Sequence, residues 1–211
     1  VTVPTYQLTA IVTDDNGNKI NDHNFIFLVG DEEVQGTYYT SEGMYIADYT
    51  FTAPGTYVIT TDYENAEIIN SSVTFIAALS SLKNIVDTAI ANGETSVDLS
   101  YGFQYYEPID GVDYHGIVIS EDFTINGNGL AIDGGNAARL FNVTNGATLT
   151  LNNITLTNGK ADEGAAVYVD NGAKLDANDV TFSSNIALDN GGAIYTDGGE
   201  ITLTNCVLDA N

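Results

Sequence analysis

Short pairs of alternating apolar residues, separated by polar corners, dominate the second half of the chain. In the segment Leu149–Leu156 the apolar residues at 149, 151, 154 and 156 alternate with polar ones. Such alternation predicts short strands with one buried face, and the pair Asn152-Asn153 predicts a bend between them. Because little helical periodicity separates such segments, the pattern favours the coil of a β-solenoid.

This unit recurs at intervals of 26 residues, as Leu149–Leu156, Leu175–Phe182 and Ile201–Leu208. Coils that stack at the strand spacing of about 4.8 Å place equivalent residues in columns. The predicted inner columns are Leu149, Leu175 and Ile201; Ile154, Val180 and Cys206; and Leu156, Phe182 and Leu208. We therefore predict a right-handed parallel β-helix, its handedness taken from the general rule for parallel crossovers.

The hydrophobic period changes shortly before this region. Apolar residues at three- and four-residue spacing predict one α-helix over residues 79–92. Ser80 or Ser81 can cap its first turn, and Gly93 follows its last. We expect this helix to cap one end of the β-helix and to join it to the N-terminal part of the chain.

The N-terminal part alternates between short apolar–polar runs and turn sequences such as Asp14–Asn18. About seven short strands with frequent turn signals predict an antiparallel β-sandwich over residues 1–76. The predicted fold class is all-β, with the parallel β-helix over 77–211. Within the β-helix we expect the cap helix 79–92, a connecting segment 93–115 and coils from 116, truncated at 211, so that the native protein continues beyond this end.

Charge limits the partners of the chain. The 211 residues include 5 Lys and Arg against 29 Asp and Glu, giving a formal net charge of −24. This balance argues strongly against nucleic acid and anionic membranes as partners, because both require a basic surface. No apolar run reaches the length of a membrane span, so we expect no direct membrane insertion. The single Cys206 excludes an internal disulfide.

Several segments of the predicted β-helix carry a family likeness: Gly116–Ile119, Phe123–Gly134, Arg139–Val143, Asn153–Gly159, Gly191–Tyr195 and Asn205–Asn211. They resemble methanogen adhesin-like proteins, archaeal surface proteins that combine immunoglobulin-like modules with β-helices. The Gly-Gly-Ala-Ile and Asn-Cys pieces also resemble repeats of bacterial polymorphic outer-membrane proteins. The likeness implies an immunoglobulin-like fold for residues 1–76 and an extracellular, cell-surface role.

Polar residues at equivalent corners have structural and ligand-binding interpretations. Asparagines at 126, 152 and 178 can form a hydrogen-bonded ladder, and we interpret them as structural. Two acidic pairs also align, Asp170 with Asp197 and Glu163 with Asp189. Carboxylates on neighbouring coils repel unless a cation lies between them, so a Ca²⁺ site at these four residues and solvated charges remain alternatives. No other cofactor is expected.

Two groups of tyrosines are candidate ligand contacts. Tyr168 and Tyr195 alternate with inward-facing neighbours, which predicts an exposed aromatic stack suited to a sugar or a protein. The alternative is a ladder that only shields the sheet face. The second group is an aromatic cluster whose candidate ligand contacts are Tyr105, Tyr106 and Tyr114. With Asp110, Asp113 and His115 this cluster could form a ligand pocket. The alternative is a long loop packed over the first coil.

We expect no enzymatic activity. Lyases of uronate polymers need cationic groups, and this chain has only Lys19, Lys83, Arg139, Lys160 and Lys174 in a strongly negative field. No motif supports a hydrolase carboxylate pair, and Cys206 falls on an inner column where a thiol packs as a small hydrophobe.

The leading hypothesis is a fragment of a cell-surface adhesin-like protein that displays a binding face on a rigid β-helix. The expected contact loops are 105–115, 159–165 and 185–191, and the expected partners are glycans or proteins of a host or neighbouring cell, or copies of the chain itself end to end. Sequons at Asn70, Asn142 and Asn153 agree with glycosylation of an exposed protein. The alternatives are an envelope or filament subunit that assembles through the open end of the β-helix, and a polysaccharide lyase or hydrolase.

Overall fold

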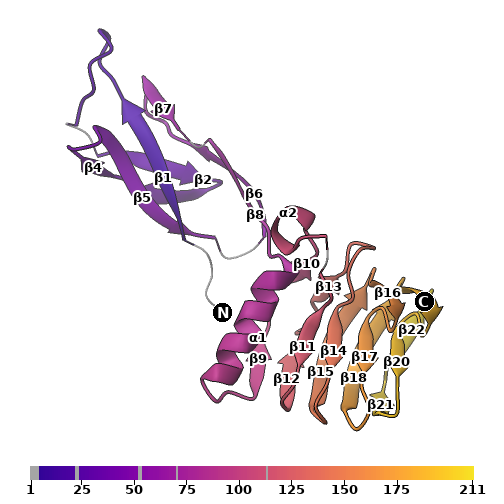
Figure 1. The fold of residues 1–211 in the computed structure, drawn as a ribbon. Helices are drawn as coiled ribbons and strands as arrows, with labels where there is room; N and C mark the ends of the chain where they lie inside the picture. Colours follow the sequence, from indigo (N-terminus) through magenta and orange to yellow (C-terminus); the bar gives the residue numbers. More distant parts are fainter. Residues whose placement is uncertain (1–4, 22–23, 52–53, 70, 113) are drawn as a thin grey trace. The chain divides into compact units, whose positions relative to one another are not determined.

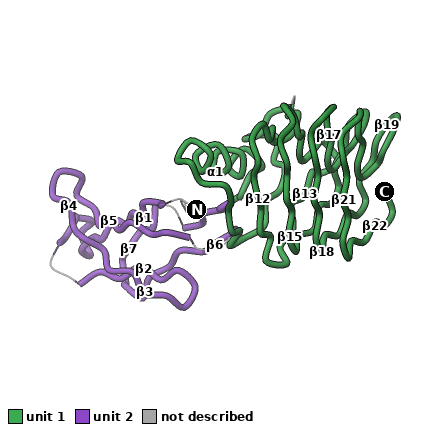
Figure 2. Tube along the Cα trace, turned by 90° about the horizontal axis from the view of Figure 1, so that it is seen from below, with its two compact units in different colours: residues 1, 76–211 green, residues 2–75 purple. Residues whose placement is uncertain are grey.

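The computed structural model describes residues 5–21, 24–51, 54–69, 71–112 and 114–211 (Figure 1). The chain divides into two compact units, one that ends at Phe75 and one formed by Ile76–Asn211 (Figure 2).

The unit that ends at Phe75 contains two antiparallel four-stranded sheets, ordered β4-β5-β1-β7 and β3-β2-β6-β8. Aromatic side chains fill its core; Phe25 stacks on Tyr45 with ring centroids 4.8 Å apart, and both are buried. The strands are β1 (Thr5–Val12), β2 (Ile26–Val29), β3 (Glu32–Gln35), β4 (Thr37–Tyr39), β5 (Met44–Thr50), β6 (Gly55–Thr60), β7 (Ala66–Ile68) and β8 (Ser72–Phe75).

The second unit is a parallel β-solenoid of about four turns, as the repeat predicts. One side is the sheet β11-β14-β17-β20, and the long strands β15 and β18 form the centre of the largest sheet. Its elements are α1 (Leu79–Ala91), β9 (Ser96–Asp98), β10 (Phe103–Gln104), α2 (Glu107–Asp110), β11 (Ile117–Ile119), β12 (Phe123–Asn126), β13 (Ala131–Asp133), β14 (Phe141–Val143), β15 (Thr148–Thr157), β16 (Lys160–Glu163), β17 (Val167–Val169), β18 (Lys174–Ser183), β19 (Ile186–Asn190), β20 (Ile194–Thr196), β21 (Glu200–Thr204) and β22 (Val207–Asp209).

Equivalent apolar residues stack in columns along this unit. Leu149 pairs with Leu175, and Leu175 pairs with Ile201, so the predicted first column is confirmed. Leu156, Phe182 and Leu208 form a second confirmed column. These columns hold the core, in which the leucines at 149 and 156 and Phe182 are fully buried.

The predicted bend at each corner does not divide the segment into two separate strands. A single residue turns the chain inside one ten-residue strand: Asn153 in β15 (φ 46°) and Asp179 in β18 (φ 55°). Asparagine and aspartate tolerate this left-handed backbone, and the parallel ladder continues on both sides of the corner.

The segments expected as loops 159–165 and 185–191 contain strands. β16 and β19 pair as a two-stranded parallel sheet, with Lys160 opposite Ile186 and Ala161 opposite Ala187. The 26-residue spacing holds at Lys160 and Ala161, whose backbones stack like the rest of the coil, and the register shifts by one residue before Glu163. The expectation of open loops in these segments was therefore wrong for their central residues.

The helix α1 has a different N-terminal cap from the predicted one. No side chain of its own first turn caps it; instead, the Asp110 carboxylate accepts hydrogen bonds from the backbone N–H of Leu79 (3.2 Å) and Ser80 (2.7 Å). The predicted Ser80 or Ser81 cap was wrong, because a carboxylate from the short helix α2 takes that place. Gly93 follows the helix with φ 77°, as predicted.

Candidate ligand-binding site

The sheet β11-β14-β17-β20 carries a polar and aromatic column on its outer face. Asn142 pairs with Tyr168 and Tyr168 pairs with Tyr195, while Val167 and Val169 on either side of Tyr168 are fully buried. The two tyrosine rings lie 5.4 Å apart between centroids. The predicted outward stack of Tyr168 on Tyr195 is therefore confirmed, whereas its role in binding stays a prediction.

Arg139 adds a cation to this column. Its Cζ lies 5.0 Å from the centroid of the Tyr168 ring. The guanidinium donates through Nε to the carbonyl of Gly164 (3.2 Å) and through Nη2 to that of Glu163 (2.7 Å). Burial lowers the pKa of Arg139, while Tyr168, Asp162 and Glu163 oppose that shift. Arg139 thus lies between the aromatic column and the β16–β17 turn.

Gly164 is required for the turn that holds Arg139. Its φ is 56°, a left-handed conformation, and a Cβ atom at this position would lie 2.6 Å from the carbonyl oxygen of Val167. Only glycine avoids this clash. The local backbone therefore fixes the two carbonyls that position the guanidinium.

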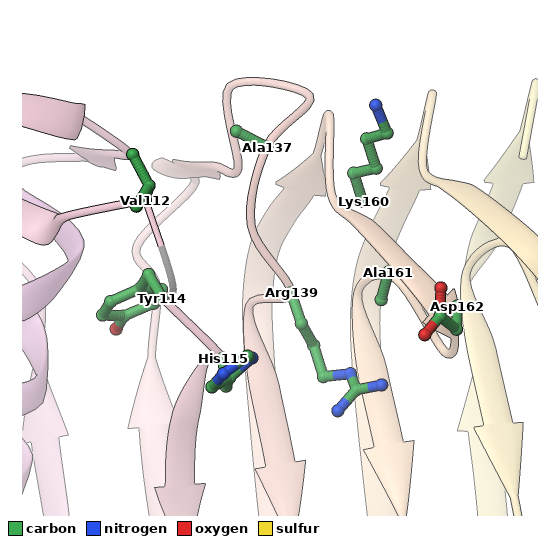
Figure 3. Close-up of a pocket in the computed structure, with 8 residues that line it drawn as sticks. All are labelled: Val112, Tyr114, His115, Ala137, Arg139, Lys160, Ala161 and Asp162. Carbon is green, nitrogen blue, oxygen red and sulfur yellow. The ribbon is translucent and has the colours of Figure 1, made fainter.

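A cavity of about 220 Å³ lies beside Arg139 (Figure 3). Its walls come from the segment after α2, the segment before β14, and β16. The lining residues are Val112, Tyr114, His115, Ala137, Arg139, Lys160, Ala161 and Asp162. In Figure 3 the Arg139 and Lys160 side chains extend in opposite directions. Two of the five Lys and Arg residues of this acidic chain therefore border one hollow.

The three tyrosines predicted as ligand contacts in the aromatic cluster, Tyr105, Tyr106 and Tyr114, do not all line this cavity. Tyr114 lines the cavity; its hydroxyl is buried without a hydrogen-bond partner among the described residues, and burial, followed by Asp110 and Asp87, raises its pKa. The Tyr105 hydroxyl donates to the carbonyl of Gly111 (2.8 Å). Tyr106 is 36% exposed and does not line the cavity.

The polar residues predicted for the same pocket also separate. His115 lines the cavity, whereas the Asp110 carboxylate is occupied as the cap of α1 and as the acceptor of the Tyr106 N–H (2.9 Å). Asp110 is therefore not among the residues that line this cavity. Asp113 lies outside the described residues.

The register of β16 and β19 changes the acidic pairs. Glu163 pairs with Asn190, not with Asp189, because the register shifts by one residue between Ala161 and Glu163. The Asn190 amide donates to Glu163 Oε1 (3.2 Å). The predicted alignment of Glu163 with Asp189 was therefore wrong.

The other acidic pair, Asp170 and Asp197, follows β17 and β20. The Asp170 carboxylate accepts the N–H of Asn171 (2.8 Å), and the backbone N–H of Asp197 donates to the carbonyl of Val169. Across the described part of the chain, no three His, Cys, Asp or Glu side chains are grouped so that they could hold a metal ion. The two alternatives for these carboxylates, a Ca²⁺ site and solvated charges, stay predictions.

Two asparagine ladders run along the solenoid. The predicted one is present: Asn152 Nδ2 donates to Asn126 Oδ1 (2.9 Å), and Asn178 Nδ2 donates to Asn152 Oδ1 (3.1 Å). The second was not predicted and contains Asn185, which is fully buried. Its Oδ1 accepts the Gly159 N–H (2.8 Å), and its Nδ2 donates to the carbonyl of Leu156 (3.1 Å).

The three predicted glycosylation sites differ in their surroundings. Asn153 is exposed at a corner of the solenoid. Asn142 is half-buried, with its Oδ1 atom buried and without a hydrogen-bond partner among the described residues, and it pairs with Tyr168 on the sheet. Asn70 lies outside the described residues. Glycosylation at all three stays a prediction.

Sequence reasoning missed Arg139, Lys160 and Asp162 as cavity residues. The available signal was charge: basic residues are scarce here, and three of them fall between 139 and 174. Spacing alone gave no reason to group Arg139 with His115, because the two come from different turns.

Residues 179–197 match the Chlamydia polymorphic membrane protein repeat. The match covers the second half of β18, all of β19 and β20, and the buried Asn185. None of the curated proteins and none of the solved structures compared with the chain matches it. The chain thus carries a repeat of the polymorphic membrane protein type on a parallel β-solenoid. None of the described helices is long and apolar enough to span a membrane.

Proposed function

We propose that this chain is part of an extracellular, cell-surface adhesin-like protein that displays a binding face on a rigid β-solenoid. The observation that carries the proposal is the polymorphic membrane protein repeat at residues 179–197, located on the stacked turns of the solenoid. The proteins that give this repeat its name are membrane proteins of Chlamydia. Their similarity to this chain supports a place at a cell surface.

Rigidity follows from the way that the turns are joined. Apolar columns fill the interior, and the amides of Asn152 and Asn178 connect successive turns at one corner. Each turn is bonded to the next along several strands at once. Such a scaffold tolerates variation at its surface, because exposed side chains outside the apolar columns and the asparagine ladders do not hold the fold.

The outer face of β14, β17 and β20 is the candidate binding face. Tyr168 and Tyr195 together offer two neighbouring rings, and Arg139 extends the column with a cation. Aromatic rings pack on the apolar faces of sugars and on protein side chains, while their hydroxyls accept and donate hydrogen bonds. This combination supports a glycan or a protein on a host or neighbouring cell as the partner.

The unit that ends at Phe75 fits an immunoglobulin-like module in this proposal. Its two antiparallel four-stranded sheets and buried aromatic core agree with a β-sandwich, and no disulfide is needed. An immunoglobulin-like module followed by a β-helix is the organisation of the methanogen adhesin-like proteins that the sequence resembles. The module would serve as a spacer in such a surface protein.

Glycan-array and cell-binding assays with the purified chain test the proposal. We expect saturable binding that the double variant Y168A/Y195A reduces by about tenfold or more, since each half-buried, outward-facing ring contributes contact area. The matched control is Y39A, which removes an exposed tyrosine of β4 in the other compact unit. Failure to bind any glycan or cell, or equal losses in both variants, would contradict a display role for this face.

A structural role in an envelope or filament is the second candidate. The apolar side chains of Leu203 (40% exposed), Val207 (53%) and Leu208 (54%) lie on the last turn of the described solenoid, where either a further turn or another subunit would cover them. These side chains suit contact with another subunit. Light scattering over a hundredfold concentration range distinguishes the two: a mass that does not change with concentration opposes assembly through this end.

The proposal includes no catalytic step. The expectation that the chain is not an enzyme is supported by the scarcity of cations on the solenoid and by the negative charge of the chain, which repels polyanionic substrates. Incubation with neutral and acidic polysaccharides tests this part. New reducing ends or unsaturated products would show that the chain is a hydrolase or a lyase.

A further inference from the structure

We propose that the cavity beside Arg139 binds a sugar acid of single-ring size through its one carboxylate. The inference shares Arg139 with the aromatic face of Tyr168 and Tyr195 proposed above, but it concerns a different ligand and is tested separately. It begins with the charge of the hollow. Among the described residues that line it, Arg139 and Lys160 supply two cationic side chains and Asp162 supplies one carboxylate. This gathering of two cations contrasts with the net charge of −24 of the whole chain.

The Arg139 guanidinium has donors left for a ligand. A guanidinium carries five N–H groups, and within the described residues two of them donate to the carbonyls of Glu163 and Gly164. Those two bonds and the Tyr168 ring fix its orientation before any ligand arrives. A planar fork that is already positioned is suited to a carboxylate, which accepts two parallel hydrogen bonds.

The size of the cavity and the field of the chain limit the ligand. About 220 Å³ is below the usual range of pockets for drug-sized ligands and admits one small ring. The surrounding acidic surface repels polyanions, so a ligand with one negative charge is favoured over an acidic polymer. The cavity offers both apolar and polar contacts to the rest of that ligand. Val112, Ala137 and Ala161 offer apolar contact, whereas Lys160 and Asp162 offer a donor and an acceptor for hydroxyl groups (Figure 3).

Titration of the purified chain with D-glucuronate, followed by NMR or calorimetry at low salt, tests the inference. D-glucose is the matched neutral probe and glucose 6-phosphate the matched phosphate probe. We expect saturable binding of glucuronate, none of glucose, and weaker binding of the phosphate. R139Q should weaken glucuronate binding by about tenfold or more, because a charge-assisted, bidentate contact is lost.

Two further variants separate binding from folding. K174Q removes the same unit of charge at a lysine outside the cavity, and it should change the affinity less than twofold. A137F fills the cavity from an exposed position that makes no side-chain hydrogen bond, and it should abolish binding with an unchanged melting temperature. This variant decides the matter if R139Q fails to fold.

Four results would overturn the inference: no saturation by glucuronate, equal binding of glucose, tighter binding of glucose 6-phosphate, or full binding by A137F. None of them bears on the glycan-array result with Y168A/Y195A, so the two proposals fail separately.

Discussion

The buried amide of Asn185 is bonded to the side chain of Asn211, which lies one turn further along the solenoid. Asn185 Nδ2 donates to Asn211 Oδ1 (2.8 Å), and the same oxygen accepts the backbone N–H of Asn185 (3.1 Å). Asn211 in turn donates to the carbonyl of Phe182 (3.0 Å), as Asn185 does to that of Leu156. One side chain per turn therefore satisfies the backbone polar groups at this corner.

Replacement of Asn185 by alanine should destabilise the solenoid strongly. The variant leaves the N–H of Gly159 and the carbonyl of Leu156 buried without partners, at a cost of about 2–4 kcal/mol in the free energy of unfolding. Urea denaturation measures this loss. N211A removes the equivalent side chain at an exposed position, where water can replace the lost bonds, and should cost less than half as much. Equal losses would contradict the role of burial.

Replacement of Asp110 by alanine should destabilise α1 by about 1 kcal/mol, because Leu79 and Ser80 lose the acceptor for their N–H groups. Thermal denaturation followed by circular dichroism measures the change. The double variant S80A/S81A is the control and should lie within about 0.5 kcal/mol of the unmodified chain. A larger effect of the serines than of Asp110 would show that the cap lies in the helix itself.

Tyr49 should titrate at an unusually high pH. Its hydroxyl donates to Glu32 Oε2 (2.7 Å), and this bond is the main cause that raises the Tyr49 pKa from 10.0 to about 12. Since the folded pKa exceeds the unfolded one, the stability that this bond contributes is complete below pH 10. It is lost as the pH rises from 10 through 12.

NMR of chain labelled in its tyrosine rings measures this titration. The variant E32Q should return the Tyr49 pKa toward 10, because it removes the carboxylate acceptor and its charge. An unchanged Tyr49 pKa in E32Q would show that burial, the second cause, is responsible instead.

Calcium should leave the thermal stability of the chain unchanged. The Glu163 carboxylate accepts from the Asn190 amide and does not face Asp189, so one of the two predicted acidic pairs is not formed. Melting with 1 mM Ca²⁺ and with chelator should give midpoints within about 2 °C of each other. A calcium-specific increase that D170N/D197N removes would restore a site at the other pair.

The periodic features of the solenoid could be predicted because each depends on spacing alone. The column of Leu149, Leu175 and Ile201 and the asparagine ladder follow from a constant 26-residue interval. The outward tyrosine stack follows from alternation with buried valines. Features that depend on one irregular residue could not be located. The shift that brings Asn190 opposite Glu163 arises from a single extra residue between repeats, and several positions along β19 could have absorbed it.

The sequence by itself determined the winding of the chain from residue 116 onward, since identical periods in successive coils force the same apolar residues to stack. Only the tertiary structure decided which distant groups meet. Asp110 caps a helix that begins 31 residues earlier, and the cavity beside Arg139 gathers side chains from three segments. Such meetings depend on how turns and connecting segments fold over the coil, and no periodic signal in the sequence encodes them.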